Sequence, residues 1–230
     1  MNDHWVNFLR TFKTHDVFLV IDDNTIQHSS HIENVNIVQV SDETCIHAHY
    51  FKSSCWSNLK DIVAWDRALY YFNHVRTDYE HVWFIEDDVF FMDENIITNI
   101  DNQYPSTDLI CAFHEINHDG NAAVGWNHWY NIIHRINPPW AHSLIAISRL
   151  SRRLLNDVDN YVKGNKHLIF IEALFNTLCL HNRYSIAHPE CIANTVTYDT
   201  KWNIKDLDIS NIYHPIKKID DHTFIREHYK

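Results

Sequence analysis

The chain has 230 residues, of which 45% are hydrophobic and only three are glycine, and this composition fits a folded globular protein rather than a disordered one. Thirty acidic and 19 basic residues give a formal net charge of −11, which argues against a general nucleic-acid binder because such a protein needs a basic face. No linker or internal repeat divides the sequence. We therefore expect residues 1–230 to form a single domain, or one domain of a longer protein.

The first part of the chain alternates predicted strands with one predicted helix. Residues 16–21 form a short apolar run before a turn signal, and residues 35–40 alternate apolar and polar side chains, so both are predicted strands. Apolar residues recur at helical spacing over 56–75, which predicts an amphipathic helix. Its N-cap is expected from one of three serines: Ser53, Ser54 or Ser57. Residues 82–85 follow as a buried strand, because β-branched and aromatic side chains dominate them.

The second part of the chain is less regular. Residues 109–113 and 143–147 are further predicted strands. Residues 150–162 show an amphipathic helical pattern, and Gly164 is expected to end that helix. Residues 168–180 are apolar nearly all round, which predicts a buried helix.

A late strand over 184–187 and a polar, loop-like tail over 201–230 complete the predicted elements. Strand and helix alternate mainly in the first half of the chain, which favours the α/β class. We expect one domain with a mixed central sheet flanked by helices.

Cysteine usage and apolar segments bear on the compartment. The five cysteines are scattered without a CxxC pair, which indicates reduced thiols. Residues 1–13 lack the apolar core of a secretory signal, and no apolar run approaches the roughly 20 residues of a membrane helix. We therefore expect a cytoplasmic protein with no transmembrane segment. Few glycines and abundant Asn, Ile and His indicate an AT-rich genome, compatible with a microbe or with a large DNA virus acting in an infected host cell.

The triplet Glu86-Asp87-Asp88 is the most informative feature. It interrupts two apolar runs, 82–85 and 89–92, where three adjacent charges are costly unless a cation binds them. Mn²⁺ or Mg²⁺ is the natural partner because hard cations prefer carboxylate oxygen. In open α/β sheets, ligands collect at the carboxyl ends of strands. The alternative is a solvated turn after a strand.

An apolar strand, an acidic triplet and further apolar residues together resemble the DXD metal motif of GT-A fold glycosyltransferases. The resemblance implies a GT-A-like (Rossmann-like) domain that uses a nucleoside-diphosphate sugar, with a UDP-sugar the expected donor. It implies that Asp88 binds the metal directly and that Glu86 and Asp87 contact the ribose or a metal-bound water. The acceptor is a glycan, a protein or a small molecule.

Two further segments fit this resemblance. Tyr213-His214-Pro215-Ile216-Lys217 lies where several GT-A enzymes supply a late His to the metal and a Lys to the diphosphate, which implies these roles for His214 and Lys217. The alternative is a surface histidine in a chain with 19 of them. Asp22 and Asp23 follow the first predicted strand, where family members bind the base and ribose; a turn or helix-cap role is the alternative.

Two charged residues on predicted helices are candidates for catalysis. Glu172 is a lone carboxylate near the start of an apolar helix, where the family places the base that takes the acceptor's proton. An inverting mechanism depends on this assignment; the alternative is a Glu bonded to a core Arg or Tyr, or to a backbone N–H. Arg67 is a candidate for adding positive charge near the diphosphate, with a surface helix charge as the alternative.

Tryptophans crowd residues 125–140, which we interpret as a sugar- or acceptor-binding loop. The candidates for stacking on a sugar are Trp126, Trp129 and Trp140, each with core packing as its alternative.

Two other functions remain open. Residues 19–25 suggest a haloacid-dehalogenase-type phosphohydrolase, but that family needs Asp-x-Asp-x-Thr, and Asn24 and Ile26 break the pattern after Asp22. The other alternative is a sugar-nucleotide- or glycan-binding module without turnover.

Overall fold

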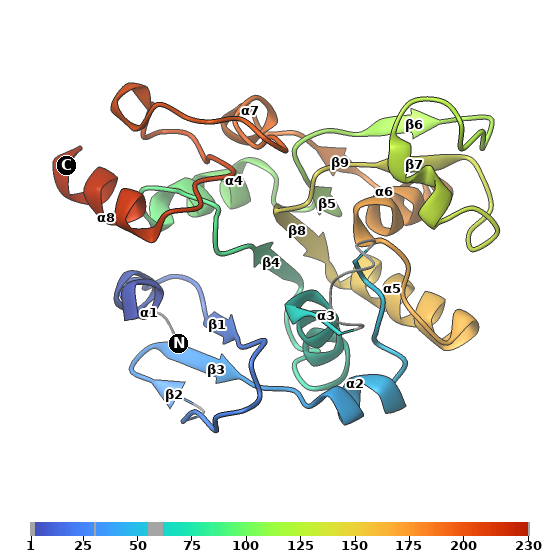
Figure 1. Cartoon of the computed structure of the whole chain (residues 1–230), viewed down its shortest axis with the longest axis horizontal. Helices are drawn as coiled ribbons and strands as arrows, with labels where there is room; N and C mark the ends of the chain where they lie inside the picture. Colours follow the sequence, from blue (N-terminus) through green and yellow to red (C-terminus); the bar gives the residue numbers. More distant parts are fainter. Residues whose placement is uncertain (1–2, 30, 55–61, 230) are drawn as a thin grey trace.

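The computed structural model describes residues 3–29, 31–54 and 62–229. It is a mixed α/β structure in which helices flank mixed sheets, as expected for the fold class (Figure 1). The N-terminal sheet has the order β1-β3-β2. In it, β1 (Val17–Val20) pairs in parallel with β3 (Val35–Val38), and β2 (His31–Ile32) pairs antiparallel with β3.

The central sheet has the order β4-β8-β5-β9. Its strands are β4 (His81–Ile85), β8 (Ile147–Ser151), β5 (Leu109–Ile110) and β9 (Ile186–Ala187). β8 runs antiparallel to both β4 and β5, whereas β5 and β9 are parallel. A separate ribbon pairs β6 (Glu115–Asn117) with β7 (Trp140–His142), and the 3₁₀ helix η1 (Asn127–Asn131) lies between them in the chain.

Both faces of the central sheet are covered, because its strands alternate their side chains. Val82 and Phe84 of β4 face a cluster formed with α3 (Ala64–His74), α5 (Arg152–Asn165) and α6 (Ile171–Asn182). Trp83 and Ile85 face the other cluster, which includes α1 (Asp3–Leu9) and α4 (Glu94–Gln103). The remaining helices are α2 (Asp42–His47), α7 (Glu190–Ala193), η2 (Ile204–Asp206) and α8 (Ile219–His228).

The strands predicted at 16–21, 35–40 and 82–85 are confirmed, whereas the helix predicted over 56–75 begins later than expected. α3 starts at Ala64, and residues 55–61 lie outside the described part of the chain. Neither Ser53 nor Ser54 caps it. Instead the Asp66 carboxylate accepts the N–H of Val63 at 2.8 Å and that of Ser53 at 3.0 Å, which satisfies the helix start from within its own first turn.

Several predictions for the second half were misplaced. The strand predicted at 143–147 is β8 at 147–151; residues 143–146 are buried but belong to no strand, and burial alone does not identify one. β5 covers only the first two residues of the range expected at 109–113, and β9 covers only the last two of the range expected at 184–187.

The helices of the second half also differ in their boundaries. α5 begins after Ser151, whose Oγ accepts the N–H of Leu154, and it continues through Gly164 until Lys166 adopts a left-handed φ of 64°. α6 begins at Ile171 rather than at residue 168. The tail expected to be loop-like carries α8, whose polar surface hides the helical pattern.

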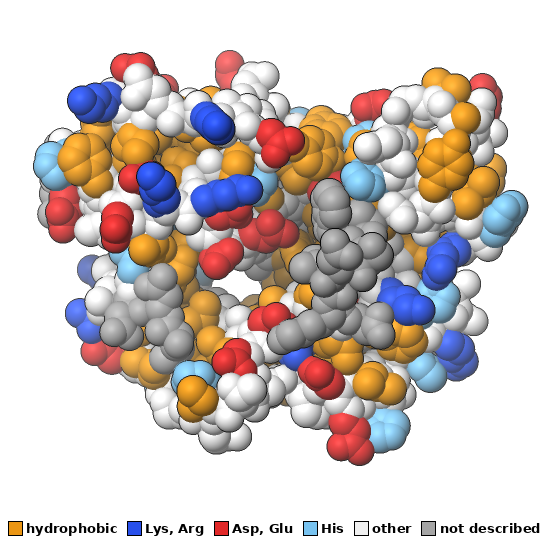
Figure 2. Space-filling view, in the orientation of Figure 1, with side chains coloured by type: hydrophobic (Ala, Val, Ile, Leu, Met, Phe, Trp, Pro, Cys, Tyr) orange, Lys and Arg blue, Asp and Glu red, His pale blue; other side chains and the backbone are white. Residues whose placement is uncertain are grey.

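A cleft of about 1130 Å³ lies between the N-terminal and central sheets. β1 and β4 both line it, and in the described chain β1 pairs only with β3 and β4 only with β8. Figure 2 shows this hollow with acidic side chains gathered around it. Within the described residues, no helix is long and apolar enough to cross a bilayer.

Candidate metal centre and its cleft

The acidic triplet lies in a turn that is anchored on both sides. The N–H of Glu86 donates to Ala146 O at 2.8 Å, which extends the pairing of β4 with its neighbour. Two residues beyond Asp88, Phe90 and Tyr213 exchange backbone hydrogen bonds of 2.8 Å in an antiparallel bridge. The chain is therefore fixed before and after the triplet, and the bridge brings in a segment more than a hundred residues away.

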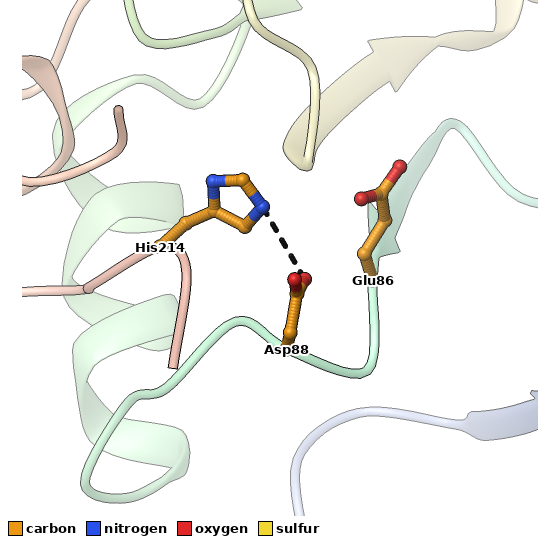
Figure 3. Close-up of side chains that lie close together, drawn as sticks. All are labelled: Glu86, Asp88 and His214. Atoms are coloured by element: carbon orange, nitrogen blue, oxygen red, sulfur yellow. Dashed lines mark ion pairs between the residues drawn. The ribbon is translucent and has the colours of Figure 1, made fainter. Parts of the chain in front are cut away.

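His214 follows Tyr213 directly and reaches Asp88. Its Nε2 lies 3.3 Å from Asp88 Oδ1 (Figure 3). Its Nδ1 lies 2.7 Å from Thr197 O; because a carbonyl can only accept, Nδ1 carries the proton. In the neutral ring, Nε2 therefore directs a lone pair at Asp88. His214 is buried, so the interpretation as a surface histidine is wrong.

The surroundings of Asp88 Oδ1 indicate whether the site suits a cation. This oxygen is buried and has no hydrogen-bond partner in the described structure. A carboxylate oxygen and an imidazole lone pair facing each other need positive charge between them, supplied either by a proton or by a metal. Glu86, Asp88 and His214 each offer one ligand atom within 4.8 Å of the others (Figure 3). Two carboxylates and an imidazole fit Mn²⁺.

The charges of the site shift its pKa values accordingly. Burial acts to raise the pKa of Asp88, but the neighbouring His214 and then Lys217 outweigh it, so that pKa is lowered. Burial acts to lower the pKa of His214, but Asp88 outweighs it and the pKa is raised. In the absence of a metal, a proton on His214 is thus the competing cation.

The Glu86 carboxylate accepts a hydrogen bond from a tryptophan and has no ion pair with a lysine or arginine in the described structure. Burial raises its pKa, and the charges of Asp88 and Asp87 add to this effect. Trp65 Nε1–H donates to its Oε1 at 2.8 Å, and the Trp65 ring stacks on Phe84 at 5.3 Å between centroids. The resemblance assigned Glu86 to ribose or metal-bound water; the structure places it close enough to be a direct ligand as well.

Glu172 lies in the first turn of α6 and lines the same cleft as Glu86. Burial raises its pKa to about 8; the charge of Glu86 adds to the rise, while Tyr198 and His214 oppose it. Tyr198 OH donates to Glu172 Oε2 at 3.0 Å; the alternative of a bond to a tyrosine is thus present, but Tyr198 is 42% exposed and is not a core residue. Sequence reasoning missed Tyr198, which lies in an irregular segment without a motif.

Arg67 is buried, so its interpretation as a surface helix charge is wrong. Its Nη1 donates to Asp22 at 2.8 Å, its Nη2 to Asp42 at 2.5 Å and its Nε to Val40 O at 3.0 Å. The guanidinium therefore joins the ends of β1 and β3 to the start of α2. Asp23 accepts the N–H of Thr25 at 2.8 Å, as a turn aspartate does.

The remaining polar candidates surround the cleft or the metal ligands. Asp22, Asp23 and Asp87 line the cleft, and Asp87 is exposed. Lys217 is exposed and makes no ion pair in the described chain, while its charge contributes to the lowered pKa of Asp88. Its ammonium is thus available to an anion.

The tryptophan segment is largely core. Trp129 and Trp140 are buried to 1% and 2% exposure, and Trp140 Nε1 donates to Ile136 O, so core packing accounts for both. Trp126 is half-buried, with His142 and Phe170 stacked nearly parallel to it at 4.2 and 5.4 Å. Neither Trp129 nor Trp140 presents a free face to a sugar.

No family model matches this chain, and a search of the curated proteins finds no relative. Glu172, whose pKa is raised, and acidic residues at two strand ends line one cavity. One of these residues, Glu86, also belongs to the candidate cation site with Asp88 and His214.

Proposed function

We propose that this chain is a metal-dependent glycosyltransferase with a GT-A-like fold. It transfers a sugar from a nucleoside-diphosphate sugar, with a UDP-sugar the expected donor, to a hydroxyl group of a glycan, protein or small molecule. The observation that carries the proposal is the orphaned Asp88 Oδ1 facing His214 Nε2 beside a large cleft. This pair is the complement of a divalent cation, and the cleft has the size of a ligand pocket.

The residues of the cleft have separate parts in donor binding. Asp88 and His214, with Glu86, hold Mn²⁺ or Mg²⁺, which when bound neutralises the charge that grows on the leaving diphosphate. Lys217 contributes a free ammonium on the same side. Asp22 and Asp23, which follow β1 and line the cleft, would accept hydrogen bonds from ribose or base. Arg67 acts indirectly, because it holds Asp22 in place.

Glu172 is the proposed base for an inverting transfer. Its carboxyl lies in the wall of the cleft, and a pKa of about 8 makes it a stronger base than an ordinary glutamate. Oε2 is occupied by Tyr198, while the described structure records no hydrogen bond to Oε1. Oε1 is therefore the oxygen available to take the proton of an acceptor hydroxyl.

Calorimetry with Mn²⁺ and a panel of uridine and guanosine diphosphate sugars tests the proposal. We expect at least one nucleotide sugar to bind only in the presence of the metal, and transfer or slow donor hydrolysis to follow. No metal-dependent binding across the panel would overturn the proposal. Binding without either reaction would indicate a non-catalytic module.

A further inference from the structure

A short segment, 195–198, makes hydrogen bonds with both the backbone and the ring of His214. The His214 N–H donates to Thr195 O at 3.0 Å, and the Thr197 N–H donates to His214 O at 3.1 Å. The His214 ring donates from Nδ1 to Thr197 O at 2.7 Å. The backbone of segment 195–198 therefore fixes both the main chain and the ring orientation of His214.

The next residue of this segment, Tyr198, points to a different group. Its hydroxyl lies 3.0 Å from Glu172 Oε2. Burial and the charge of Glu172 raise the pKa of Tyr198, which keeps the hydroxyl protonated and able to donate. A hydrogen bond from the Trp126 side chain opposes this rise.

We propose that Tyr198 is the positioning residue of Glu172, and that segment 195–198 sets the place of this carboxyl relative to His214. The inference rests on the proposed function and deepens it. A single stretch of chain holds the imidazole of the metal site by its backbone and the base by its side chain.

The physical reason lies in the surroundings of Glu172. The groups that act on its carboxyl are the Glu86 charge, which raises its pKa, and Tyr198 and His214, which lower it. Of these, Tyr198 makes the recorded hydrogen bond. Occupying Oε2 fixes the rotation of the carboxyl and leaves Oε1 without a recorded hydrogen bond in the described structure, and the same bond favours the charged form that accepts a proton.

Tyr198→Phe in the full chain, assayed with Mn²⁺ and the donor found by calorimetry, tests the proposal. We expect kcat to fall about 10-fold, since a hydrogen bond to a charged group is lost, with donor KM and Mn²⁺ affinity unchanged within twofold. The acidic limb of the kcat profile should move to higher pH, because the lost hydrogen bond had lowered the pKa of Glu172. Tyr104→Phe is the control: Tyr104 lies at the end of α4, away from the residues that line the cleft, and its hydroxyl has no hydrogen bond in the described structure. A Tyr198→Phe enzyme with unchanged kcat and pH profile would overturn the proposal.

A second measurement needs no substrate and separates this proposal from the transferase assignment. Infrared difference spectra against pH follow the carboxyl bands, and Glu172→Gln identifies the band of Glu172. We expect Tyr198→Phe to shift this band and raise its midpoint, even in a protein that transfers no sugar. An active enzyme whose Glu172 band is unaffected by Tyr198→Phe would leave the transferase proposal standing and refute the positioning role.

Discussion

Two strands end in acidic residues on the same cleft, but their charges are compensated differently. At the end of β1, Asp22 receives a hydrogen bond from the buried guanidinium of Arg67. At the end of β4, Glu86 and Asp88 have no ion pair with a lysine or arginine in the described structure; Asp88 pairs with His214, and the charge of Lys217 also helps to lower its pKa. The difference shows that an acidic strand end is not in itself a metal site. What matters is whether the chain supplies its own cation.

The largest expected effect of any substitution in the cleft is a loss of turnover. Glu172→Gln should lower transfer by about 10²–10⁴-fold, because a positioned base is lost, while Mn²⁺ and donor binding persist. Kinetics and calorimetry on one preparation measure both. An active Glu172→Gln enzyme would remove the base assignment and with it the argument for inversion.

Removing one charge after β4 and one after β1 tests whether the two strand ends differ in metal binding. Asp88→Asn should weaken Mn²⁺ binding by more than about 100-fold, because it removes a ligand whose oxygen has no other partner. Asp22→Asn should leave Mn²⁺ affinity within about threefold, because Arg67 already compensates this carboxylate. Calorimetry measures both variants. Equal losses would mean that the two ends do not differ as described.

The free energy of unfolding should depend more on the β1 end than on the β4 end, the reverse of the order expected for Mn²⁺ affinity. Arg67→Leu should lower the free energy of unfolding by about 2–3 kcal/mol, because the guanidinium makes three hydrogen bonds, two of them to carboxylates. Asp88→Asn should lower it by less, about 1 kcal/mol, because Asp88 has a single ion-pair partner in the described structure, His214, against the three hydrogen bonds of Arg67. Urea unfolding followed by circular dichroism checks the pair. An Arg67→Leu protein of unchanged stability would contradict the structural role.

The smallest effect expected is on the pH dependence of metal binding. The pKa of His214 is raised above its ordinary value of 6.5, so the ring takes a proton as the pH falls through that raised pKa. The metal must then displace the proton, and Mn²⁺ affinity should fall by up to about tenfold per pH unit below it. Calorimetry between pH 5.5 and 8, run in two buffers, should also detect proton release on binding. A pH-independent affinity would exclude His214 as a ligand.

The sequence predicted the part of the site that depends on local pattern. β4 is recognisable from its β-branched and aromatic residues, and the triplet stands out because apolar runs enclose it. The partnership of Asp88 with His214 came from a family resemblance rather than from spacing. Its physical basis is the bridge between Phe90 and Tyr213, which no local pattern reveals.

The rest of the site depends on contacts between distant segments. Arg67 occupies one position on a helix, and only the folding of the chain around Asp22 and Asp42 turns that position into a buried one. Trp129 and Trp140 carry a strong aromatic signal, but composition does not tell a core face from an exposed one. The polar helix α8 buries His222 and Ile225, which is too little for an apolar stripe to appear in the sequence.

The bridge between Phe90 and Tyr213 also has a consequence for biosynthesis. β4 and the acidic triplet leave the ribosome long before residue 214, because synthesis proceeds from the N-terminus, whereas the bridge needs Tyr213. A nascent chain that stops before His214 therefore has the carboxylates without the imidazole. Under the proposed function, metal loading would be a late event of synthesis, and tight Mn²⁺ binding would report that the C-terminal segment has docked.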